Sequence, residues 1–487
     1  MPLPDGAPTS REVLDRIYAE RGPIFPRTYN QEAALRRARE DDPAHHTDTV
    51  RGALATAKAP DIAEGQSAAQ DPMAGDSGGD DWPQALGPAA FSGIAGEFVR
   101  MVEPDTEADP AAILMHFLIA FGVHVGRGPH WKVEKTEHHA GLFSVLVAPT
   151  AKGRKGTARN RALEPFAALP SWKTEVSGLS SGEGLINQVR DPGEKRSRSR
   201  HGEDIVETIA GVEDKRLLVI EPEFARVLRV AQRDGNTLSA TLRELWDYGR
   251  ARTLTKHDPI GTSLAHIAVI GHITADELRA ELTATDIANG FANRFLFVAA
   301  RRSNVLPFGG ALTDPAIVRG FTDRLAAFAA TARSRSRIDM TPDARSIWGR
   351  VYPELSAGGD GLHGAVTARA EAQAVRLALI YALLDGAPAI DAPHLMAGLA
   401  VWTYCDATVR YIWGASLGDR VADEIMRRLR QAGDAGLTRT EIRDAFGRHQ
   451  STERIGAALE LLQRKGRATC ETTSTGGRPV DTWRATK

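Results

Sequence analysis

The 487-residue sequence is poor in cysteine: it contains only Cys405 and Cys470, which lie far apart and form no C-x-x-C pair. A disulfide framework needs several cysteines at regular spacing, and a structural zinc site usually shows paired cysteine ligands. The sequence therefore indicates neither a disulfide-stabilised scaffold nor a zinc module. We expect a protein of a reducing compartment, the cytoplasm.

The sequence also lacks an apolar run long enough to span a membrane. About 20 consecutive apolar residues are needed to cross a bilayer as a helix. The most apolar stretch, residues 111–125, is interrupted by His116 and His124. The first residues, MPLPDGAPTSREVLDR, lack the basic and then apolar pattern of a secretory signal peptide. We expect no membrane partner.

An excess of charge of either sign is absent too. The formal net charge is -1, so the chain as a whole does not attract nucleic acid, and any such contact must be local. Hydrophobic residues make up 42% of the chain and charged residues 25%, which is typical of soluble globular proteins. A chain of this length is expected to form about two to four domains.

Composition divides the chain into five parts. Residues 1–43 contain two short amphipathic helix candidates. Residues 44–88 are rich in Ala, Asp, Gly and Pro, with too few large apolar side chains to fold, and are interpreted as a disordered linker. Residues 89–312 begin with two helical stretches and continue with short apolar strands. Residues 313–417 are mostly helical and resemble a lid, and residues 418–487 form a final unit.

Residues 89–312 are predicted to form an α/β core of the P-loop NTPase class. Their strand candidates are apolar at every position rather than at every second one. Continuous apolar runs are typical of strands buried on both faces of a parallel sheet, which points to a doubly wound fold. The runs are residues 141–147, 216–220, 266–270 and 294–299.

A candidate phosphate loop follows the first of these strands. A P-loop needs a strand, then a glycine-rich turn whose N–H groups surround phosphate oxygens, then a helix that begins with Lys and Ser or Thr. The segment LFSVLVAPTAKGRKGTARNRALEPF has this order. The standard G-x4-G-K-[ST] spacing places Ala148 and Gly153 at the glycines, Arg154 at the lysine and Lys155 at the Ser/Thr position.

A second register, with one inserted residue, supplies both chemistries. Lys155 is then the phosphate lysine, Thr157 the magnesium ligand, and Gly156 relieves the turn between them. We prefer this register and predict ATP and Mg²⁺ as cofactors, with Gly153 and Arg154 completing the loop. The alternative is a basic surface loop without a ligand.

The second strand ends in two carboxylates, in RLLVIEPEF. A hydrophobic strand that ends in an acid is where P-loop ATPases hold magnesium and polarise the attacking water. Glu221 is therefore predicted to orient the water shell of the metal, and Glu223 to act as the base. In the alternative interpretation, Glu223 only complements the dipole of the following helix.

Two further polar residues flank the later strands. IAVIGHIT places His272 at the carboxyl end of a buried strand, where a γ-phosphate sensor would sit. NGFANRFLFV places Arg294 at the start of the last strand, where it could stabilise transition-state charge in a neighbouring subunit of a ring. The alternatives are a structural histidine and an arginine in a salt bridge at a domain edge.

The final unit has the pattern of a winged helix. A helix is expected over 419–432, a second is capped by Thr438 with Glu441 as its capping-box partner, and a third begins at Ser451. Two short strands, RATCETT and PVDTWRAT, follow on either side of the turn STGGR.

Residues 418–487 contain 14 Lys and Arg against 10 Asp and Glu, a net charge of +4. We predict that Arg448, His449 and Arg454, around the start of the third helix, enter a major groove of DNA, and that Arg478 contacts the backbone. Winged helices also serve as protein-docking modules, which is the alternative.

The order of motifs resembles a bacterial and phage family of primase-helicase-like proteins of unknown function that are associated with mobile elements. The resemblance implies a RecA-like or AAA+-like ATPase that acts as a helicase or motor in DNA replication, as a homo-oligomer such as a ring. The helix around Arg376 also resembles the lid of minichromosome-maintenance helicases, which implies that Arg376 is a second sensor. The segments that carry the resemblance are GRKGTA, EGLI, RLLVIEPEFA, LWDYG, IAVIGHIT, NGFANRFLFV, VRLALIYALLDG and VWTYC.

Two hypotheses of different class follow. In the first, the chain is an ATP-dependent DNA motor or helicase. In the second, it is a non-hydrolysing DNA-binding regulator or assembly factor that keeps a degenerate P-loop fold, because Ala148 replaces the first glycine and the Lys and Thr are not adjacent.

Overall fold

The computed structural model describes residues 82–486 with several short gaps. The predicted N-terminal segment, 1–43, and all but the last part of the predicted linker, 44–88, lie outside the described residues. The described ranges are 82–173, 175–198, 204–254, 259–310, 314–359, 361–414, 419–447, 449–473 and 480–486.

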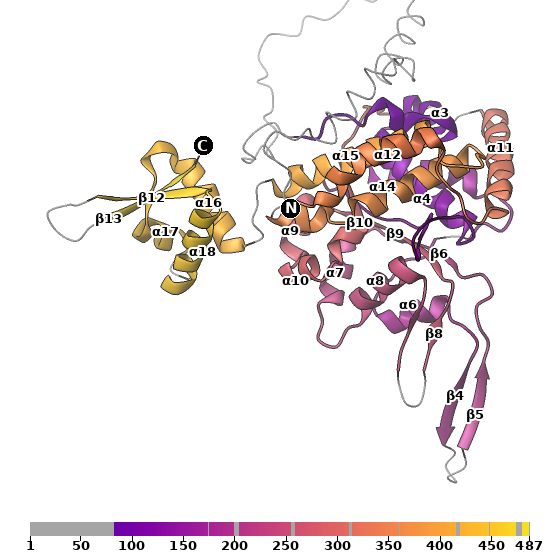
Figure 1. Cartoon of the computed structure of the whole chain (residues 1–487), viewed down its shortest axis with the longest axis horizontal. Helices are drawn as coiled ribbons and strands as arrows, with labels where there is room; N and C mark the ends of the chain where they lie inside the picture. The colour runs from indigo at the N-terminus through magenta and orange to yellow at the C-terminus, as the bar shows by residue number, and fades with distance from the viewer. Residues whose placement is uncertain are drawn as a thin grey trace, which may run out of the picture.

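A four-stranded parallel sheet lies at the centre of the α/β part, as the continuous apolar runs predict (Figure 1). The strands follow one another in space in the order β10-β3-β9-β6, and all neighbouring pairs are parallel. Their bounds are β3 (Phe143–Val147), β6 (Arg216–Glu221), β9 (His266–Ile273) and β10 (Phe295–Ala299).

Both faces of this sheet are covered, which explains why its strands are apolar throughout. Side chains alternate between two hydrophobic cores along each strand; Leu146 faces one core, and its neighbours Val145 and Val147 face the other. The first core is filled mainly by α3 (Gly93–Val102), α4 (Pro110–Val125), α14 (Ala370–Leu384) and α15 (Ala392–Trp413). The second is filled by α6 (Gly182–Gln188), α7 (Phe224–Ala231), α8 (Leu238–Tyr248) and α9 (Ala275–Glu281).

Helix α4 is the central helix of the first core. It begins where the sequence requires, because the carboxylate of Asp109 accepts a hydrogen bond from the N–H of Ala111 at 2.9 Å and Pro110 occupies the first turn. Nearly all of its residues are buried, including His116 and His124. A helix that is buried on all sides needs no polar face, which explains why this stretch is apolar except for the two histidines.

The helical region after the sheet packs through α14 and α15. A Cβ atom on Gly398 would lie 2.7 Å from the backbone nitrogen of Ala378, so only glycine allows the two helices to approach this closely. Among the described residues, no helix combines the length and the apolar character needed to cross a bilayer. The other helices of this region are α11 (Pro315–Arg333), α12 (Pro342–Ala357) and α13 (Gly361–Thr367).

Three antiparallel two-stranded ribbons lie outside the central sheet, and the one formed by β4 and β5 extends away from it (Figure 1). The ribbons are β1 (His130–Val133) with β2 (Thr136–His139), β4 (Gly193–Arg198) with β5 (Asp204–Ile209), and β7 (Ala251–Arg252) with β8 (Gly261–Thr262). The remaining short elements are η2 (Pro88–Phe91), η3 (Glu103–Asp105), α5 (Lys155–Leu163), η4 (Glu164–Phe166), α10 (Ala284–Ala288) and η5 (Ala292–Arg294).

The final part of the chain has a hydrophobic core of its own, which contains Leu429, Leu459 and Trp483. The expected helices and strands are confirmed, including the capping box in which Thr438 and Glu441 exchange hydrogen bonds. The strands form one antiparallel sheet in the order β11-β13-β12. The elements are α16 (Arg420–Ala432), η6 (Gly433–Ala435), β11 (Leu437–Thr438), α17 (Arg439–Ala445), α18 (Thr452–Arg464), β12 (Ala468–Thr473) and β13 (Val480–Ala485).

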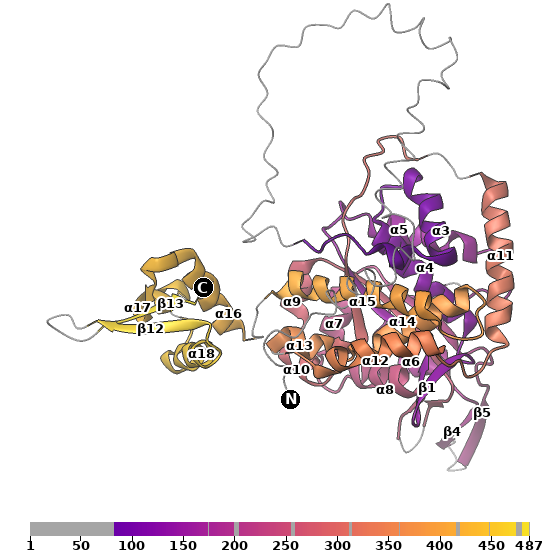
Figure 2. The same ribbon diagram turned by 45° about the horizontal axis from the view of Figure 1, so that its top comes forward.

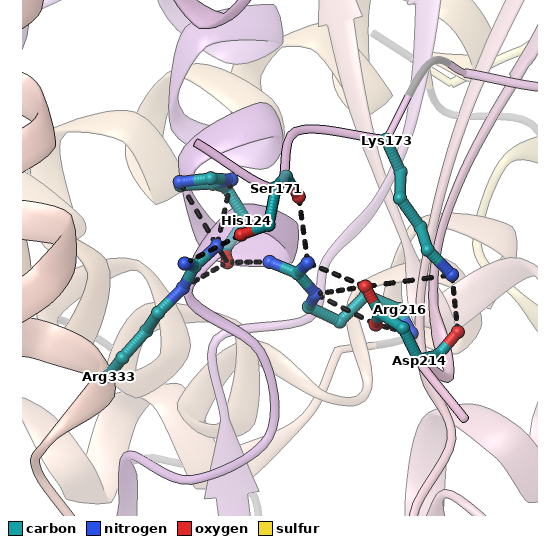
Figure 3. A network of polar contacts seen from close by, with 6 residues as sticks. All are labelled: His124, Ser171, Lys173, Asp214, Arg216 and Arg333. Atoms are coloured by element: carbon teal, nitrogen blue, oxygen red, sulfur yellow. Dashed lines mark hydrogen bonds and ion pairs between the residues drawn. The ribbon is translucent and has the colours of Figure 1, made fainter. Parts of the chain in front are cut away.

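A polar network at the end of α4 joins segments that are distant in sequence (Figure 3). The guanidinium groups of Arg216 and Arg333 both donate to the carbonyl oxygen of His124, and Arg333 also contacts its ring. Arg216 is held in turn by the carboxylate of Asp214. Burial and the two arginines lower the pKa of His124 to about 3, so this histidine is neutral in the folded chain.

We expect mild acid to destabilise the folded chain, because several buried histidines must stay neutral. Unfolded histidines titrate near 6.5, so below that pH the unfolded chain binds more protons and the free energy of unfolding falls as the pH is lowered toward 4. Each such histidine lowers it by up to roughly 1.4 kcal/mol per pH unit in this window. Burial is the main cause of the low pKa in each case, about 4 for His116, about 3 for His124 and His266, and about 2 for His139 and His272.

Urea unfolding followed by circular dichroism at several pH values between about 7.5 and 5 measures this effect. In the variant His124→Gln the free energy of unfolding should change less steeply with pH, by the uptake of about one proton, because glutamine does not titrate. The matched variant His449→Gln, at an exposed position, should keep the full dependence. An unfolding midpoint that does not change over this pH range would contradict the expectation.

Candidate functional site

The connections between the strands single out one place at the edge of the sheet. From β3 the chain proceeds to β6, two positions away on one side, whereas from β9 it crosses to β10 on the other side of β3. Neighbouring strands β3 and β9 therefore send their connections in opposite directions. In parallel α/β sheets, ligands bind at the carboxyl ends of such a pair of strands.

The segment after β3 is a compact loop that lies at this place. It starts beside β9, since the N–H of Ala148 donates to the carbonyl of Ile273 at 3.1 Å, and it turns back where the N–H of Gly153 donates to the carbonyl of Pro149 at 3.1 Å. A Cβ atom on Gly153 would lie 2.5 Å from the Cβ of Ala148, so the turn requires glycine. Ala151 and Arg154 adopt positive φ angles of 55° and 49°, a strained conformation that is typical of functional loops.

Helix α5 begins directly after the loop, so its amino end lies near the carboxyl ends of β3 and β9. Its first main-chain hydrogen bond runs from the N–H of Ala158 to the carbonyl of Arg154. Among the described residues, no acceptor pairs with the N–H groups of Lys155, Gly156 and Thr157. Three free N–H groups at the positive end of a helix dipole form a favourable environment for an anion such as phosphate.

The side chain of Lys155 folds over the loop. Its ammonium group donates to the carbonyl oxygens of Ala148 and Pro149, at 2.8 and 3.4 Å. Burial lowers the pKa of Lys155, and the negative charges of Glu277 and Glu223 oppose this effect. The two carboxylates therefore lie within electrostatic reach of the ammonium group, at the ends of β9 and β6.

Arg154 points away from this group of residues. Its Nε atom lies 2.7 Å from a carboxylate oxygen of Glu107, which also holds Arg302. The N–H of Leu306 and the side chain of Arg302 lower the pKa of Glu107, so the carboxylate stays charged. The pairing occupies Arg154, whereas Lys155 contacts the loop; the choice between the two registers stays a prediction. Thr157 is exposed on the first turn of α5.

The two acids after β6 differ in their surroundings. Glu221 is only 1% exposed, and one of its oxygens accepts from the N–H groups of Gly178 and Leu179, at 2.7 and 2.6 Å. Its other oxygen accepts from Arg226 at 3.1 Å. Glu221 therefore ties the segment before α6 to the sheet. Glu223, by contrast, is exposed at the start of α7 and caps no N–H group of that helix with its side chain.

His272 is buried between β9 and α4, with its Nε2 atom 3.1 Å from Nε2 of His116. The Nδ1 atom of His116 lies 2.8 Å from the carbonyl of Ala112 and must donate to it, so His272 is the donor in the contact between the rings. Burial, His116 and the nearby positive charges of Lys155 and Arg159 lower the pKa of His272 to about 2. Both histidines of the pair are therefore neutral.

Two predicted arginines lie at the amino ends of the strands, opposite the loop after β3. Arg294 precedes β10 and pairs with Asp247. Arg376 of α14 is buried, where it donates to the carbonyls of Gly141 and Trp246 and lies 3.6 Å from the centre of the Trp246 ring. The structure does not bring either arginine together with Lys155 in one chain, because the amino ends of parallel strands lie across the sheet from their carboxyl ends. A role in a neighbouring subunit stays a prediction.

The predicted DNA contacts are only partly described. Arg448 and Arg478 lie outside the described residues. His449 is exposed between α17 and α18. Arg454 donates to the carboxylate of Asp419 at 2.6 Å, and this bond joins the start of α18 to the start of α16.

Three contributors to the site were not singled out from the sequence: Glu107, His116 and Glu277. Glu277 could have been found, because Thr274 and Glu277 form a T-x-x-E capping box directly after β9. Glu107 and His116 meet their partners only in the folded chain. Within the described residues, no cluster of His, Cys, Asp and Glu has the geometry of a metal site of three or more such ligands.

No model of a known protein family matches the sequence, and no curated protein matches it either.

The contrast between the two acids after β6 predicts opposite effects on stability. Glu221→Gln should lower the free energy of unfolding by about 1–3 kcal/mol, because a buried carboxylate that accepts two N–H bonds and an arginine is lost. Glu223→Gln, the same change at an exposed position, should alter it by less than about 0.5 kcal/mol. Urea unfolding of both variants measures the difference. Equal stability of the two variants would show that Glu221 has no structural role.

Proposed function

We propose that this chain is a DNA-associated ATPase with a P-loop core and a C-terminal winged helix. The observation that carries the proposal is the loop of residues 148–154, which connects a strand buried on both faces to α5 and ends at Lys155. It lies where the connections of β3 and β9 run in opposite directions, and the ammonium group of Lys155 donates to the loop and is influenced by the charges of Glu223 and Glu277. This combination is what phosphate binding at a helix terminus requires.

The residues of the loop fit the triphosphate of ATP. The free N–H groups of residues 155–157 and the ammonium group of Lys155 would hold its phosphate oxygens, and Gly153 lets the loop close tightly enough to surround them. The carbonyls that hold Lys155 are neutral, so the ammonium group can leave them for a phosphate without leaving a charge unpaired. His116 of α4 and His272 of β9 form a neutral hydrogen-bonded pair, and the charge of Lys155 acts on the ring of His272.

Thr157 and Glu223 are the residues that fit a magnesium ion beside these phosphates. Oxygen ligands are what Mg²⁺ prefers. Thr157 has a hydroxyl group on the first turn of α5, and Glu223 has a carboxylate directly after β6. When bound, the ion neutralises phosphate charge. Glu223 is exposed and would also be able to accept a proton from water, whereas Glu221 would act through the segment it holds.

Three helices followed by a β-hairpin, with local positive charge, support the assignment of residues 418–487 as a DNA-binding winged helix. In this proposal Arg448, His449, Arg454 and Arg478 contact DNA, and Arg454 leaves Asp419 when it does so. From the sequence resemblance we propose that the chain forms a homo-oligomer, such as a ring, in the cytoplasm and acts as a helicase or motor in replication of a mobile element or phage. Arg294 or Arg376 would then serve a neighbouring subunit.

One observation favours a second candidate function, a DNA-binding regulator or assembly factor that does not hydrolyse ATP. Glu221, the acid at the end of β6, is committed to the N–H groups of Gly178 and Leu179 and to Arg226. A carboxylate held in this way is not free to act on a metal ion or on water. In this alternative, nucleotide would bind to the loop without being cleaved.

Measurement of ATP turnover separates the two functions. With magnesium present, we expect turnover by the purified chain that increases with single-stranded DNA and falls by at least about 100-fold in Lys155→Ala. Lys152→Ala, the same change in the same loop, is the matched control and should keep most of the activity. Nucleotide binding without turnover by the unaltered chain would support the non-hydrolysing regulator instead.

The two glycines of the loop give an independent test of nucleotide binding. Gly153→Ala should abolish binding of ATP, because its Cβ atom would lie 2.5 Å from that of Ala148 and 2.8 Å from the carbonyl oxygen of Pro149. Gly156→Ala should bind normally, since no atom lies within 4 Å of the added Cβ. Calorimetric titration with ATP and magnesium measures both. Equal affinities of the two variants would remove the loop from the binding site.

A further inference from the structure

A cavity of about 640 Å³ lies away from the phosphate loop, between the β1–β2 ribbon, α12 and the start of α14. Figure 2 shows β1 beside α12. Arg369, one of the lining residues, also contacts Asn293 and Asp247, which belong with the residues at the amino ends of the strands. The cavity therefore lies on the opposite side of the sheet from Lys155. Its volume is in the range of sites that hold a nucleotide-sized ligand.

Aromatic rings form one wall of this cavity. Trp131 of β1 and Trp348 of α12 meet edge to face with their ring centres 6.2 Å apart, and Tyr352 follows Trp348 at 5.6 Å. Tyr352 is 46% exposed, although large apolar surfaces are usually buried. A row of rings that remains accessible beside a cavity is a surface on which flat ligands stack.

Helix α12 presents these rings together with a cation. Arg345, Trp348 and Tyr352 are spaced by three and four residues, so they lie on one face of the helix, and Gly349 between them leaves the face open. The Nε atom of Arg345 donates to the carbonyl of Met340, and among the described residues no carboxylate forms an ion pair with its guanidinium group. The cation is therefore available to an anionic ligand.

Two polar atoms in the wall have no hydrogen-bond partner among the described residues. They are Oε2 of Glu371 and Nδ1 of His138, both buried. Buried polar atoms in folded proteins nearly always have a partner, so a water molecule or a polar group of a ligand in the cavity could pair with them. Burial lowers the pKa of His138 to about 4, so its ring is neutral and can accept or donate one hydrogen bond.

We propose that this cavity binds an unpaired nucleotide, whose base stacks on Trp348 and Tyr352 and whose phosphate pairs with Arg345. Rings alone would accept any flat apolar molecule, and a cation alone would accept any anion. Their alternation on one helix face matches the alternation of base and phosphate in a nucleotide. The same chemistry is offered by a free nucleotide and by single-stranded DNA. The site does not depend on the phosphate loop and is separate from residues 418–487.

Anisotropy of a labelled single-stranded oligonucleotide of about 20 nucleotides, added to the full chain without magnesium or ATP, tests the site. Tyr352→Ala and Trp348→Ala should each weaken binding by about tenfold, and Trp348→Phe should restore most of it, because a stacking ring is retained. Arg345→Gln should reduce the dependence of log Kd on log salt by about 0.7, as expected for one lost phosphate contact. Arg350→Gln, the same change on α12 outside the cavity, should bind normally.

Gly349→Glu guards against loss of folding as an explanation. Its Cβ position is open, so the variant should fold, and the added carboxylate should repel phosphate and weaken binding by at least about tenfold. Gly349→Ala should bind as the unaltered chain does. Circular dichroism confirms the fold of each variant. Unchanged affinity in Gly349→Glu, Tyr352→Ala and Arg345→Gln would overturn the proposal.

Photocrosslinking with halogenated deoxyuridine in the same oligonucleotide, followed by mass spectrometry, locates the contact. Crosslinks to Trp131, Trp348 or Tyr352 support the site, and crosslinks confined to residues 418–487 overturn it. Binding of dAMP, compared with binding of the oligonucleotide, distinguishes the two sources of the ligand. If dAMP binds and the oligonucleotide does not, the ligand is a free nucleotide. Binding of neither probe overturns the proposal. Lys155→Ala should leave these results unchanged, so failure of the ATPase proposal can be distinguished from failure of this one.

Discussion

Burial of the central sheet on both faces is the constraint on which the rest of the structure depends. The two cores exclude charged groups from the faces of β3, β9 and β10, so polar chemistry can occur only where the strands begin or end. Parallel direction then separates these two edges. Lys155, Glu223 and Glu277 gather at the carboxyl ends, whereas Arg294, Arg376 and Asp247 gather at the amino ends. The sheet thus gives the chain two chemically different sides.

Many of the polar groups that enter the cores are neutral or hydrogen-bonded. His116 and His272 hydrogen-bond to each other between α4 and β9, and burial and neighbouring arginines keep His124 and His266 neutral. Glu221 is buried as well, and three donors surround it. Such groups stabilise one arrangement of distant segments, because each leaves an unsatisfied atom if its partner moves.

The sequence was sufficient for features that depend on local patterns. The apolar runs located all four strands, Thr438 with Glu441 located the start of α17, and the loop after β3 was found from its glycine, its basic residues and the strand before it. Contacts between distant segments could not be predicted: His116 meets His272, and Arg154 turns to Glu107 rather than to the loop. The position of Arg294 could be predicted in part from the sequence, because a residue that precedes a parallel strand lies at the amino end of that strand.

The charged groups at the carboxyl ends of the strands differ in their hydrogen-bond partners, and this difference indicates which of them can respond to a ligand. Lys155 is held by two neutral carbonyls, so its transfer to a phosphate exchanges weak hydrogen bonds for stronger charge-assisted ones. Glu221 would have to abandon two N–H groups and an arginine, which leaves several buried groups unpaired. In the proposed function, recognition of a nucleotide would therefore proceed by movement of Lys155 and Glu223, while Glu221 keeps the segment before α6 in place. This division makes the exposed acid, rather than the buried one, the group that is free to act in chemistry.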